Sequence, residues 1–492
     1  MTQTLQNTLN SEQRRSQISG GHRLISQVRS KPFQLYSQRE FASKSVAIDA
    51  KYWVDEVMPA LAHAVSRSAA ARVDAALGRA RKQAKEYGVT KPGAAELVAE
   101  ALFDGKWFKA KKEHFGRAEL RDQVLGMISA GRPVELVLPL FSRKPFSPVK
   151  NRGPAPDTAE IHSLARCAAL AHTLNALSPT GAVFRVLADG RKYNRACRTP
   201  DDLVLDYQDS LRVWVRELGA ADVLEICDYE DWVRSGITSS HWDRRASRYA
   251  EWVVDLERGY TPFFDETDPV PSLDELTASS DVGSQLAFTF WSIATSTCYS
   301  AFRQARDDAF AGLVDRDHVM DAYSHYVTSL RRPLSEVAPR ADIGFEVDHG
   351  ALRREAFSAA CRYVAISLAD RDLNVLRTVT PDAVKLTIHG KPGELHFVTA
   401  TSRDANMTAQ HCTGGYDLEA GEAKPTFRYL IEREAAGEVP VLVSGARHRV
   451  AADDRYRALA RLETGLQPIA YVSDTGPVLG DSLHQLMERA DV

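Results

Sequence analysis

Hydrophobic residues near the start of the chain follow the spacing of a helix. Between residues 52 and 87 they recur every three or four positions, and the first of them are Val54, Val57, Met58, Leu61 and Val65. The sequence that follows, "RSAAARVDAALGRARKQAKEYG", continues the helix with alanine, arginine and lysine, which favour helical backbone. We therefore predict a helical N-terminal extension over residues 46–130.

Beyond residue 130 the pattern changes to short strands that alternate with helices. The predicted strands are rich in Val, Ile and Leu and bounded by Gly, Pro or Asp, and they read "VELVLPL", "AVFRVLADG", "ADVLEICD", "AVKLTIHG" and "ELHFVTAT". Helical spacing appears between them, over residues 161–174 and 357–368. This alternation predicts an α/β fold, a mostly parallel sheet covered by helices, over residues 131–450.

The remaining segments carry weaker patterns. Residues 1–45 are rich in Gln, Ser and Arg without an apolar core, which favours a disordered tail over a secretory signal or a transit peptide. The Pro- and Asp-rich stretch "YTPFFDETDPVPSLDE" predicts a surface loop or a join, followed by helical sequence to about residue 329. Residues 451–492 form a C-terminal segment to which the sequence assigns no role.

Composition and charge narrow the class of protein. The 492 residues are 44% hydrophobic and 26% charged with a net charge of −3, a globular balance without a field that attracts nucleic acid. We therefore read the basic face of residues 66–87 as a solvated surface rather than a nucleic-acid site. The six cysteines include no C-x-x-C pair, which indicates neither a zinc site nor a disulfide framework and suits the cytoplasm. No run approaches the ~18 apolar residues of a membrane span, so we expect no membrane partner.

A cationic loop follows the first predicted strand of the sheet. Arg143, Lys144, Lys150 and Arg152 lie within ten residues, and four prolines stiffen the loop over residues 141–158. Ligands of open α/β sheets bind beyond the carboxyl ends of strands, which favours a phosphate or carboxylate here. A surface loop whose cations face water is the alternative, and in both cases we expect the two lysines to be exposed without ligand.

The loop ends in the tetrapeptide "DTAE", a capping-box pattern. Asp157 is placed to cap the following helix, and Glu160 to reach back to it from the third helical position. Such a cap contributes about 1 kcal/mol, which is reason enough for both residues. Either carboxylate is also able to hold a ligand amine, although the motif favours capping.

Three later stretches complete an ordered set with this loop: "LADGRKYNRACRTPDDLVLDYQDSLR", "VKLTIHGKPGELHF" and "NMTAQHCTGGYD". Over roughly residues 130–420 the set resembles the isonitrile (isocyanide) synthases, a family grouped with pyoverdine and dityrosine biosynthesis proteins. The residues that match the family patterns are Lys144, Lys150, Pro156, Asp157, Glu160, Asp189, Gly190, Tyr193 (in place of Phe), Tyr207, Lys385, Leu386, Ile388, His389 and His411.

The resemblance implies a reaction. The α-amine of an amino acid would condense with the C2 ketone of the co-substrate ribulose 5-phosphate, and breakdown of the sugar would leave one carbon on nitrogen as an isonitrile. No metal and no redox cofactor are implied. The partners are then small-molecule substrates, and nothing in the sequence indicates an oligomeric state.

The resemblance also assigns roles to residues. The catalytic set would be Lys144, Asp189, His389 and His411, and the substrate-binding set Arg143, Lys150, Arg152, Glu160 and Tyr193. The loop cations would hold the phosphate, and Asp189 would orient or deprotonate the amine, although an "Asp-Gly" hairpin turn is its ordinary reading. The histidines would move protons, since their unperturbed pKa lies near 6.5.

Four positions depart from the family pattern. Pro145, Ser147, Ala188 and Gln410 stand where Ser, Asn, Ser and Trp are usual. Losing a tryptophan removes up to ~250 Å² of apolar surface, whereas Gln410 offers an amide. We therefore predict an amino-acid substrate with a polar or smaller side chain, unless Gln410 points away from the site.

Two other functions compete with the isonitrile synthase. Release of an N-formyl amino acid differs only by the addition of water. A non-catalytic protein that binds a phosphosugar or an amino acid is the other, but it would have little reason to keep the carboxylates and histidines that transfer protons.

Overall fold

The computed structural model describes residues 45–86, 91–104, 116–144, 150–197, 199–260, 282–294, 349–388, 395–399, 407–419, 422–451 and 453–473. Within these residues the strands form two five-stranded sheets. The predicted tail and most of the predicted Pro- and Asp-rich loop lie outside the described residues. So does the helical sequence predicted beyond residue 294.

The first sheet is the predicted one. Its order is β4 (Leu224–Asp228), β3 (Ala182–Ala188), β2 (Val134–Pro139), β5 (Val384–Thr387) and β6 (Leu395–His396). Every neighbouring pair is parallel. All five predicted strands are present, so the predicted α/β class with a parallel sheet is confirmed.

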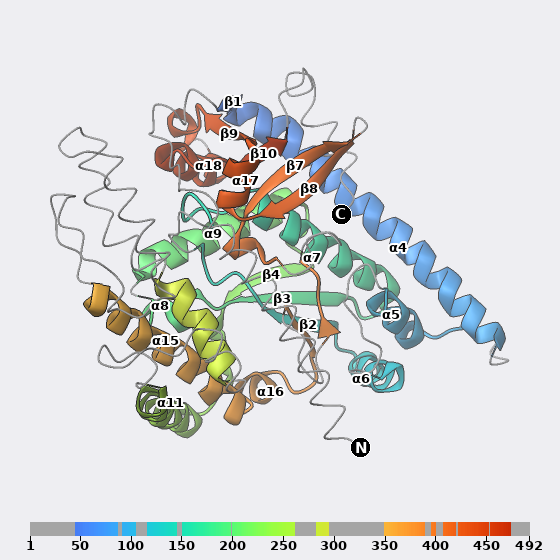
Figure 1. The fold of residues 1–492 in the computed structure, drawn as a ribbon. Helices are drawn as coiled ribbons and strands as arrows, with labels where there is room; N and C mark the ends of the chain where they lie inside the picture. The colour runs from blue at the N-terminus through green and yellow to red at the C-terminus, as the bar shows by residue number, and fades with distance from the viewer. Residues whose placement is uncertain are drawn as a thin grey trace.

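Helices cover both faces of the parallel sheet. Figure 1 shows α7 (Thr158–Leu177) and α9 (Asp201–Glu217) above it, and α11 (Ser239–Tyr260), α15 (His349–Asp372) and α16 (Val375–Val379) below it. Two shorter helices, α8 (Gly190–Asn194) and α10 (Tyr229–Gly236), follow β3 and β4 directly. The carboxyl ends of the strands therefore open toward α8, α10 and α15.

The second sheet was not predicted. Its order is β1 (Val46–Asp49), β9 (Val439–Ser444), β10 (Ala470–Ser473), β7 (Thr413–Glu419) and β8 (Glu422–Arg428). Parallel and antiparallel pairs are mixed, and β1 lies parallel to β9. Three further elements accompany it, α17 (Leu430–Ala436), the short 3₁₀ turn η6 (Arg447–Arg449) and α18 (Asp454–Gly465).

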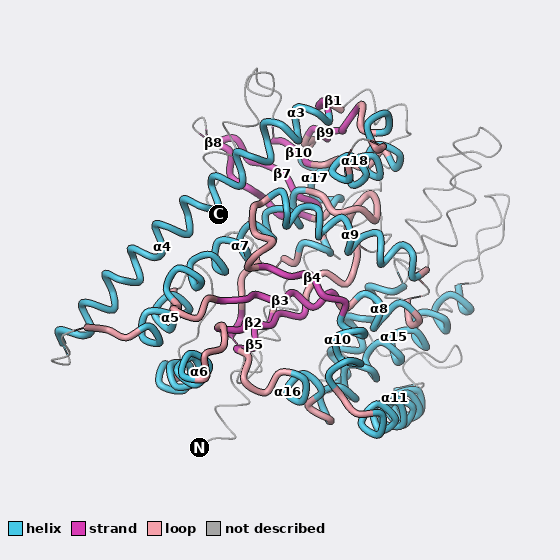
Figure 2. Tube along the Cα trace, turned by 180° about the vertical axis from the view of Figure 1, so that it is seen from behind, coloured by secondary structure: helices cyan, strands magenta, loops and turns pink. Residues whose placement is uncertain are grey.

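The predicted helical N-terminal region is confirmed. It begins with α3 (Ala50–Tyr52), passes through a π-helical turn, η1 (Trp53–Val57), and continues as α4 (Met58–Glu86), α5 (Ala94–Leu102) and α6 (Arg117–Ser129). The five apolar positions that predicted the first helix are all buried. The long helix α4 crosses α7 and extends well beyond it, as both views show (Figures 1 and 2).

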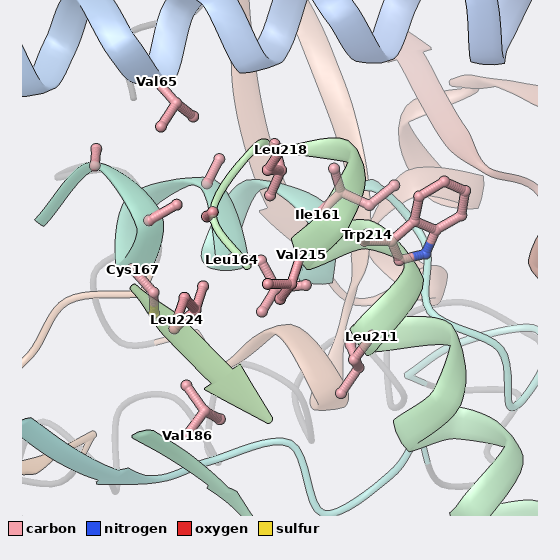
Figure 3. Close-up of a cluster of buried hydrophobic side chains, with 14 of the residues drawn as sticks. Val65, Ile161, Leu164, Cys167, Val186, Leu211, Trp214, Val215, Leu218 and Leu224 are labelled. Atoms are coloured by element: carbon pink, nitrogen blue, oxygen red, sulfur yellow. The ribbon is translucent and has the colours of Figure 1, made fainter. Parts of the chain in front are cut away.

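The core surrounds α7. Figure 3 shows Val65 of α4 facing side chains of α7, α9, β3 and β4, among them Ile161, Leu164, Cys167, Val186, Leu211, Trp214, Val215, Leu218 and Leu224. A helix with apolar residues on every side is a buried helix. The first turn of α7 is buried too, which decides the environment of Asp157 and Glu160. No described helix has the length and apolar character of a membrane span.

Candidate functional site

The carboxyl ends of β2 and β3 hold the first group of predicted site residues. Asp189 follows β3 directly and precedes α8. Both neighbours of β3 are parallel, so Asp189 does not close a hairpin. A Cβ atom on Gly190 would lie 2.0 Å from the Ser142 carbonyl oxygen. The glycine therefore permits the close approach of α8 to the loop that follows β2.

Asp189 lies among polar and aromatic side chains. The Ser142 hydroxyl donates to Asp189 Oδ1 at 2.5 Å. Tyr193 stacks on Tyr363 with ring centroids 3.8 Å apart, and its hydroxyl pairs with Ser367 Oγ at 2.8 Å. Burial raises the pKa of the Tyr363 phenol, and Asp189 raises it further, whereas Arg143 lowers it. The Asp189 carboxylate and the Arg143 guanidinium thus both lie near enough to Tyr363 to affect its pKa, and all three residues are partly exposed.

A buried network of ion pairs holds α8, the helix that carries Tyr193, in place. Lys192 Nζ lies 2.7 Å from Asp370 Oδ2, and Arg245 Nε lies 2.5 Å from Asp370 Oδ1. Burial alone would raise the pKa of Asp370, but Lys192 and Arg245 lower it below its ordinary value. Arg245 also pairs with Glu230. The network fixes α8 against α10, α11 and α15.

Lys144 is not exposed, contrary to our expectation for the cationic loop. Its side chain is 0% exposed, because β2 delivers it against the buried first turn of α7. The ammonium Nζ lies 2.7 Å from Asp157 Oδ2, 2.7 Å from the Cys412 carbonyl oxygen and 3.1 Å from Glu160 Oε2. Two of its N–H donors are thus hydrogen-bonded to Asp157 and Cys412, and Glu160 forms a second ion pair with the same ammonium.

The capping box at the start of α7 is confirmed. Asp157 Oδ1 accepts from Ala159 N at 2.8 Å, and Glu160 Oε2 accepts from Asp157 N at 3.0 Å. The two carboxylates also hold an amine, as the alternative reading allowed, but it is the amine of Lys144. Asp157 Oδ1 further accepts from Gly414 N at 3.0 Å, which ties the helix to β7.

Glu160 is the second carboxylate of this network. Its Oε1 accepts a hydrogen bond from the Tyr207 hydroxyl at 2.8 Å. Burial raises the pKa of Glu160 to about 8, although Lys144 acts in the opposite direction. Two buried carboxylates face one ammonium, so a proton on Glu160 relieves the excess negative charge.

Lys150 is also buried, at 6% exposure, which again differs from the exposed lysine that we predicted. Its Nζ donates to Ser292 Oγ at 2.7 Å and lies 5.7 Å from the centre of the Trp291 ring. Both residues belong to the helix over residues 282–294. Burial lowers the pKa of Lys150 to about 8. Among the described residues it has no carboxylate partner.

Other predicted site residues lie near these groups. His411 ends the short η5 turn (Ala409–His411), one residue before the Cys412 carbonyl that accepts from Lys144. Gln410 is buried, and its Oε1 has no hydrogen-bond partner. Arg152 is partly exposed on the loop. His389, Pro145 and Ser147 lie outside the described residues.

The structure therefore assembles three groups from the predicted residues. Asp189, Arg143 and Tyr193 share the first; Lys144 and Glu160, with His411 alongside, form the second; Lys150 stands in the third. Sequence reasoning missed several members, namely Ser142, Tyr363, Ser367, Asp370, Trp291 and Ser292. No local motif marks them: Ser142 is an ordinary residue of the loop after β2, and only tertiary packing brings the others to the strand ends. The described residues contain no cluster of three His, Cys, Asp or Glu side chains suited to a metal ion.

Comparisons with known proteins agree with the predicted resemblance. Residues 124–265 match the model of the family described as pyoverdine/dityrosine biosynthesis protein. That segment contains β2 to β4, the cationic loop, Glu160, Asp189 and Tyr193. The resemblance to this family is confirmed over the segment.

Two curated relatives share part of the chain. The L-tyrosine isonitrile synthase of Pseudomonas aeruginosa is 35% identical over 101 residues, which are 20% of this chain and 31% of that protein. The L-tyrosine isonitrile synthase of Xenorhabdus nematophila is 30% identical over 98 residues, 20% of this chain and 29% of that protein. The matched stretches thus span about a third of each relative.

A solved structure was also found. The crystal structure of the PvcA protein from Pseudomonas aeruginosa is 20% identical, with a TM-score of 0.44. The match covers 71% of this chain and 97% of the other.

Proposed function

We propose that this protein is an isonitrile synthase-like enzyme that condenses the α-amine of an amino acid with the C2 ketone of ribulose 5-phosphate. One observation carries the proposal. The segment that matches the family is the segment that sets a carboxylate and a guanidinium, Asp189 and Arg143, at the carboxyl ends of two parallel strands. In open α/β folds, ligands bind at this edge.

The amino acid is assigned to the group around Asp189. A zwitterionic amino acid needs an anion for its ammonium and a cation for its carboxylate, and Asp189 and Arg143 supply both. The α-amine attacks a ketone only after it loses a proton, and Asp189 is the carboxylate placed to accept it. The stacked rings of Tyr193 and Tyr363 limit the volume beside that position.

The sugar phosphate is assigned to the far end of the cationic loop, where Lys150 and Arg152 lie. Lys144 is left out of this role, because its ammonium already lies against two carboxylates and a backbone carbonyl of the protein. It instead holds the loop against α7. Glu160, with a pKa of about 8, and the histidines His389 and His411 remain the groups proposed to move protons at neutral pH.

The chemistry proposed here uses ribulose 5-phosphate as co-substrate and calls for neither a metal nor a redox cofactor. Gln410 supports a substrate with a polar or smaller side chain, since its buried amide oxygen lacks a partner that a ligand donor would supply. The two curated relatives are named for L-tyrosine, so tyrosine is the natural competitor in any test of this preference.

The test is an incubation of the full chain with ribulose 5-phosphate and each of the twenty amino acids, followed by mass spectrometry. We expect one amino acid to gain a carbon and lose two hydrogens, or to gain a formyl group if the product is hydrated. Asp189→Asn, which keeps the shape of the side chain, should abolish turnover. Binding of both compounds without any product would instead support the non-catalytic binding protein.

A further inference from the structure

Lys144, Lys192 and Lys150 follow the carboxyl ends of strands in the described part of the chain with side chains largely removed from water, and they differ in their partners. Lys144 and Lys192 each lie 2.7 Å from an aspartate oxygen. Lys150 instead meets the neutral hydroxyl of Ser292 at 2.7 Å and the face of Trp291. Burial therefore removes the ammonium from water, and no carboxylate among the described residues supplies a counter-charge.

Asn151, which follows Lys150, gives independent evidence that a ligand binds beside this part of the loop. Asn151 is 1% exposed, and neither its amide nitrogen nor its amide oxygen has a hydrogen-bond partner. Buried polar groups are paired in nearly all native structures, so an amide with both atoms unsatisfied indicates a missing polar partner. The hydroxyl groups of a sugar are both donors and acceptors and suit it.

We propose that Lys150 is a catalytic nucleophile that forms an imine with the ketone of the phosphosugar before the amino acid arrives. The inference rests on the proposed function for the identity of the ketone. It deepens that function, because it assigns Lys150 to the carbonyl carbon rather than to the phosphate. Trp291 then covers the amine, Ser292 lies within proton-transfer distance of it, and Arg152 takes the phosphate.

The electrostatics of the site favour the reactive form of the amine. A lysine desolvated beside apolar surface and lacking a carboxylate is the usual arrangement for an amine that attacks carbonyl groups. Burial lowers the pKa of Lys150 to about 8 from 10.5. Near pH 7 this raises the neutral fraction of the amine by about 300-fold over an exposed lysine.

The proposed steps balance without any oxidant. The Nζ lone pair adds to C2 of the sugar, and the oxygen receives a proton through the Ser292 hydroxyl to give a carbinolamine. Loss of one water molecule leaves the imine between Lys150 and C2. The α-amine of the amino acid then adds to the same carbon and displaces Lys150 as a neutral amine, so that the sugar is transferred to the amino acid.

The competing reading is that Lys150 merely attaches the loop to the helix over residues 282–294. Reductive trapping separates the two. The full chain is incubated with ribulose 5-phosphate and sodium cyanoborohydride, and its intact mass and peptides are measured. We expect one reduced sugar adduct per chain, on Lys150, while Lys144 stays unmodified in the same digest. Addition of the substrate amino acid before the reductant should discharge the imine and lower the yield of adduct.

Two variants serve as controls. Lys150→Arg keeps the cation but is not expected to form an imine, and it should lose the adduct while retaining the melting temperature. Lys150→Met serves the same purpose if the arginine does not fit. Loss of the adduct in either variant also shows that the adduct forms on Lys150 and not on lysines at random.

The outcomes are distinct from those of the function itself. An adduct on Lys150 without product from any amino acid would uphold the imine and refute the synthase. Product without an adduct on Lys150 would refute the imine and leave the synthase standing. Adducts spread over surface lysines, or no adduct on folded protein, would also overturn the assignment.

Discussion

Lys144 and Lys150 occupy one loop, six residues apart, and both are buried, yet their surroundings are opposite. The Lys144 ammonium lies against two carboxylates and a backbone carbonyl. Lys150 contacts a hydroxyl and an indole ring. Burial therefore does not decide what a lysine does in this protein; the presence of a counter-charge does. The first lysine holds the framework, whereas the second is left with a reactive amine.

The largest effect that separates the two lysines is expected on stability. Lys144→Met leaves Asp157 and Glu160 buried without their cation, and breaking such a pair costs about 3–5 kcal/mol. Lys150→Met removes a buried charge that no described carboxylate neutralises, and it should be neutral or stabilising. Denaturant unfolding of both variants at pH 7 measures the difference. An unchanged midpoint for Lys144→Met would contradict the contrast.

The next effect is a gain of stability with rising pH that comes from the lowered pKa of Lys150. Its pKa is about 8 in the folded protein, against 10.5 for a lysine exposed to water, so between these values the unfolded chain binds more protons. The wild type should therefore gain stability relative to Lys150→Met as the pH rises from 8 to 10.5, by roughly 2–4 kcal/mol. Unfolding curves at several pH values check this. If the difference in unfolding free energy between the wild type and Lys150→Met does not change with pH, the pKa of Lys150 is that of a lysine exposed to water, which would contradict the prediction.

Substitutions of Asp157, the carboxylate partner of Lys144, test the same buried ion pair. Asp157→Ala removes the helix cap and the charged bond to Lys144, and we expect a loss of about 2 kcal/mol or more. Asp157→Asn should restore the part of the unfolding free energy that the helix cap contributes, about 1 kcal/mol. It should not restore the part that comes from the ion pair with Lys144. Thermal unfolding of the three proteins measures both shares. Full recovery in Asp157→Asn would show that the ion pair contributes little.

The smallest expected change comes from Tyr207. Tyr207→Phe removes the hydrogen bond to Glu160 Oε1 and should lower stability by about 1 kcal/mol. The same bond lowers the pKa of Glu160, so the variant should raise that pKa further. Nuclear magnetic resonance of the labelled carboxyl carbon follows the titration. A lower pKa in the variant would contradict the assigned bond.

Much of the fold could be predicted because its signals are local. The parallel strands are runs of Val, Ile and Leu, and the cap of α7 is contained in four residues. Two strands of the mixed sheet, β7 and β8, read "TGGYDLE" and "EAKPTFR" and carry no such run, although β9, "VPVLVS", does. Strand β1 of this sheet pairs with the distant β9, as in Val46 with Val441, and local patterns say nothing about such pairing.

The site was less predictable for the same reason. Asp189 could be placed at the end of a strand from the sequence, and the parallel pairing of β3 agrees. The burial of Lys144 depends on Cys412, and that of Lys150 on Trp291 and Ser292, all of which are distant in the chain. The local sequence showed the cations of the loop but not which of them would pair with a carboxylate.

The central claim is that a carbon of the sugar is transferred to the nitrogen of an amino acid, and isotope labelling tests it most directly. The full chain is incubated with ribulose 5-phosphate carrying ¹³C at C2 and with ¹⁵N-labelled amino acid. The account predicts a product in which ¹³C is bonded to ¹⁵N, seen as a ¹³C–¹⁵N coupling and as both mass shifts in one ion. Product without ¹³C on nitrogen, or intact recovery of both compounds by folded protein that binds them, would contradict it.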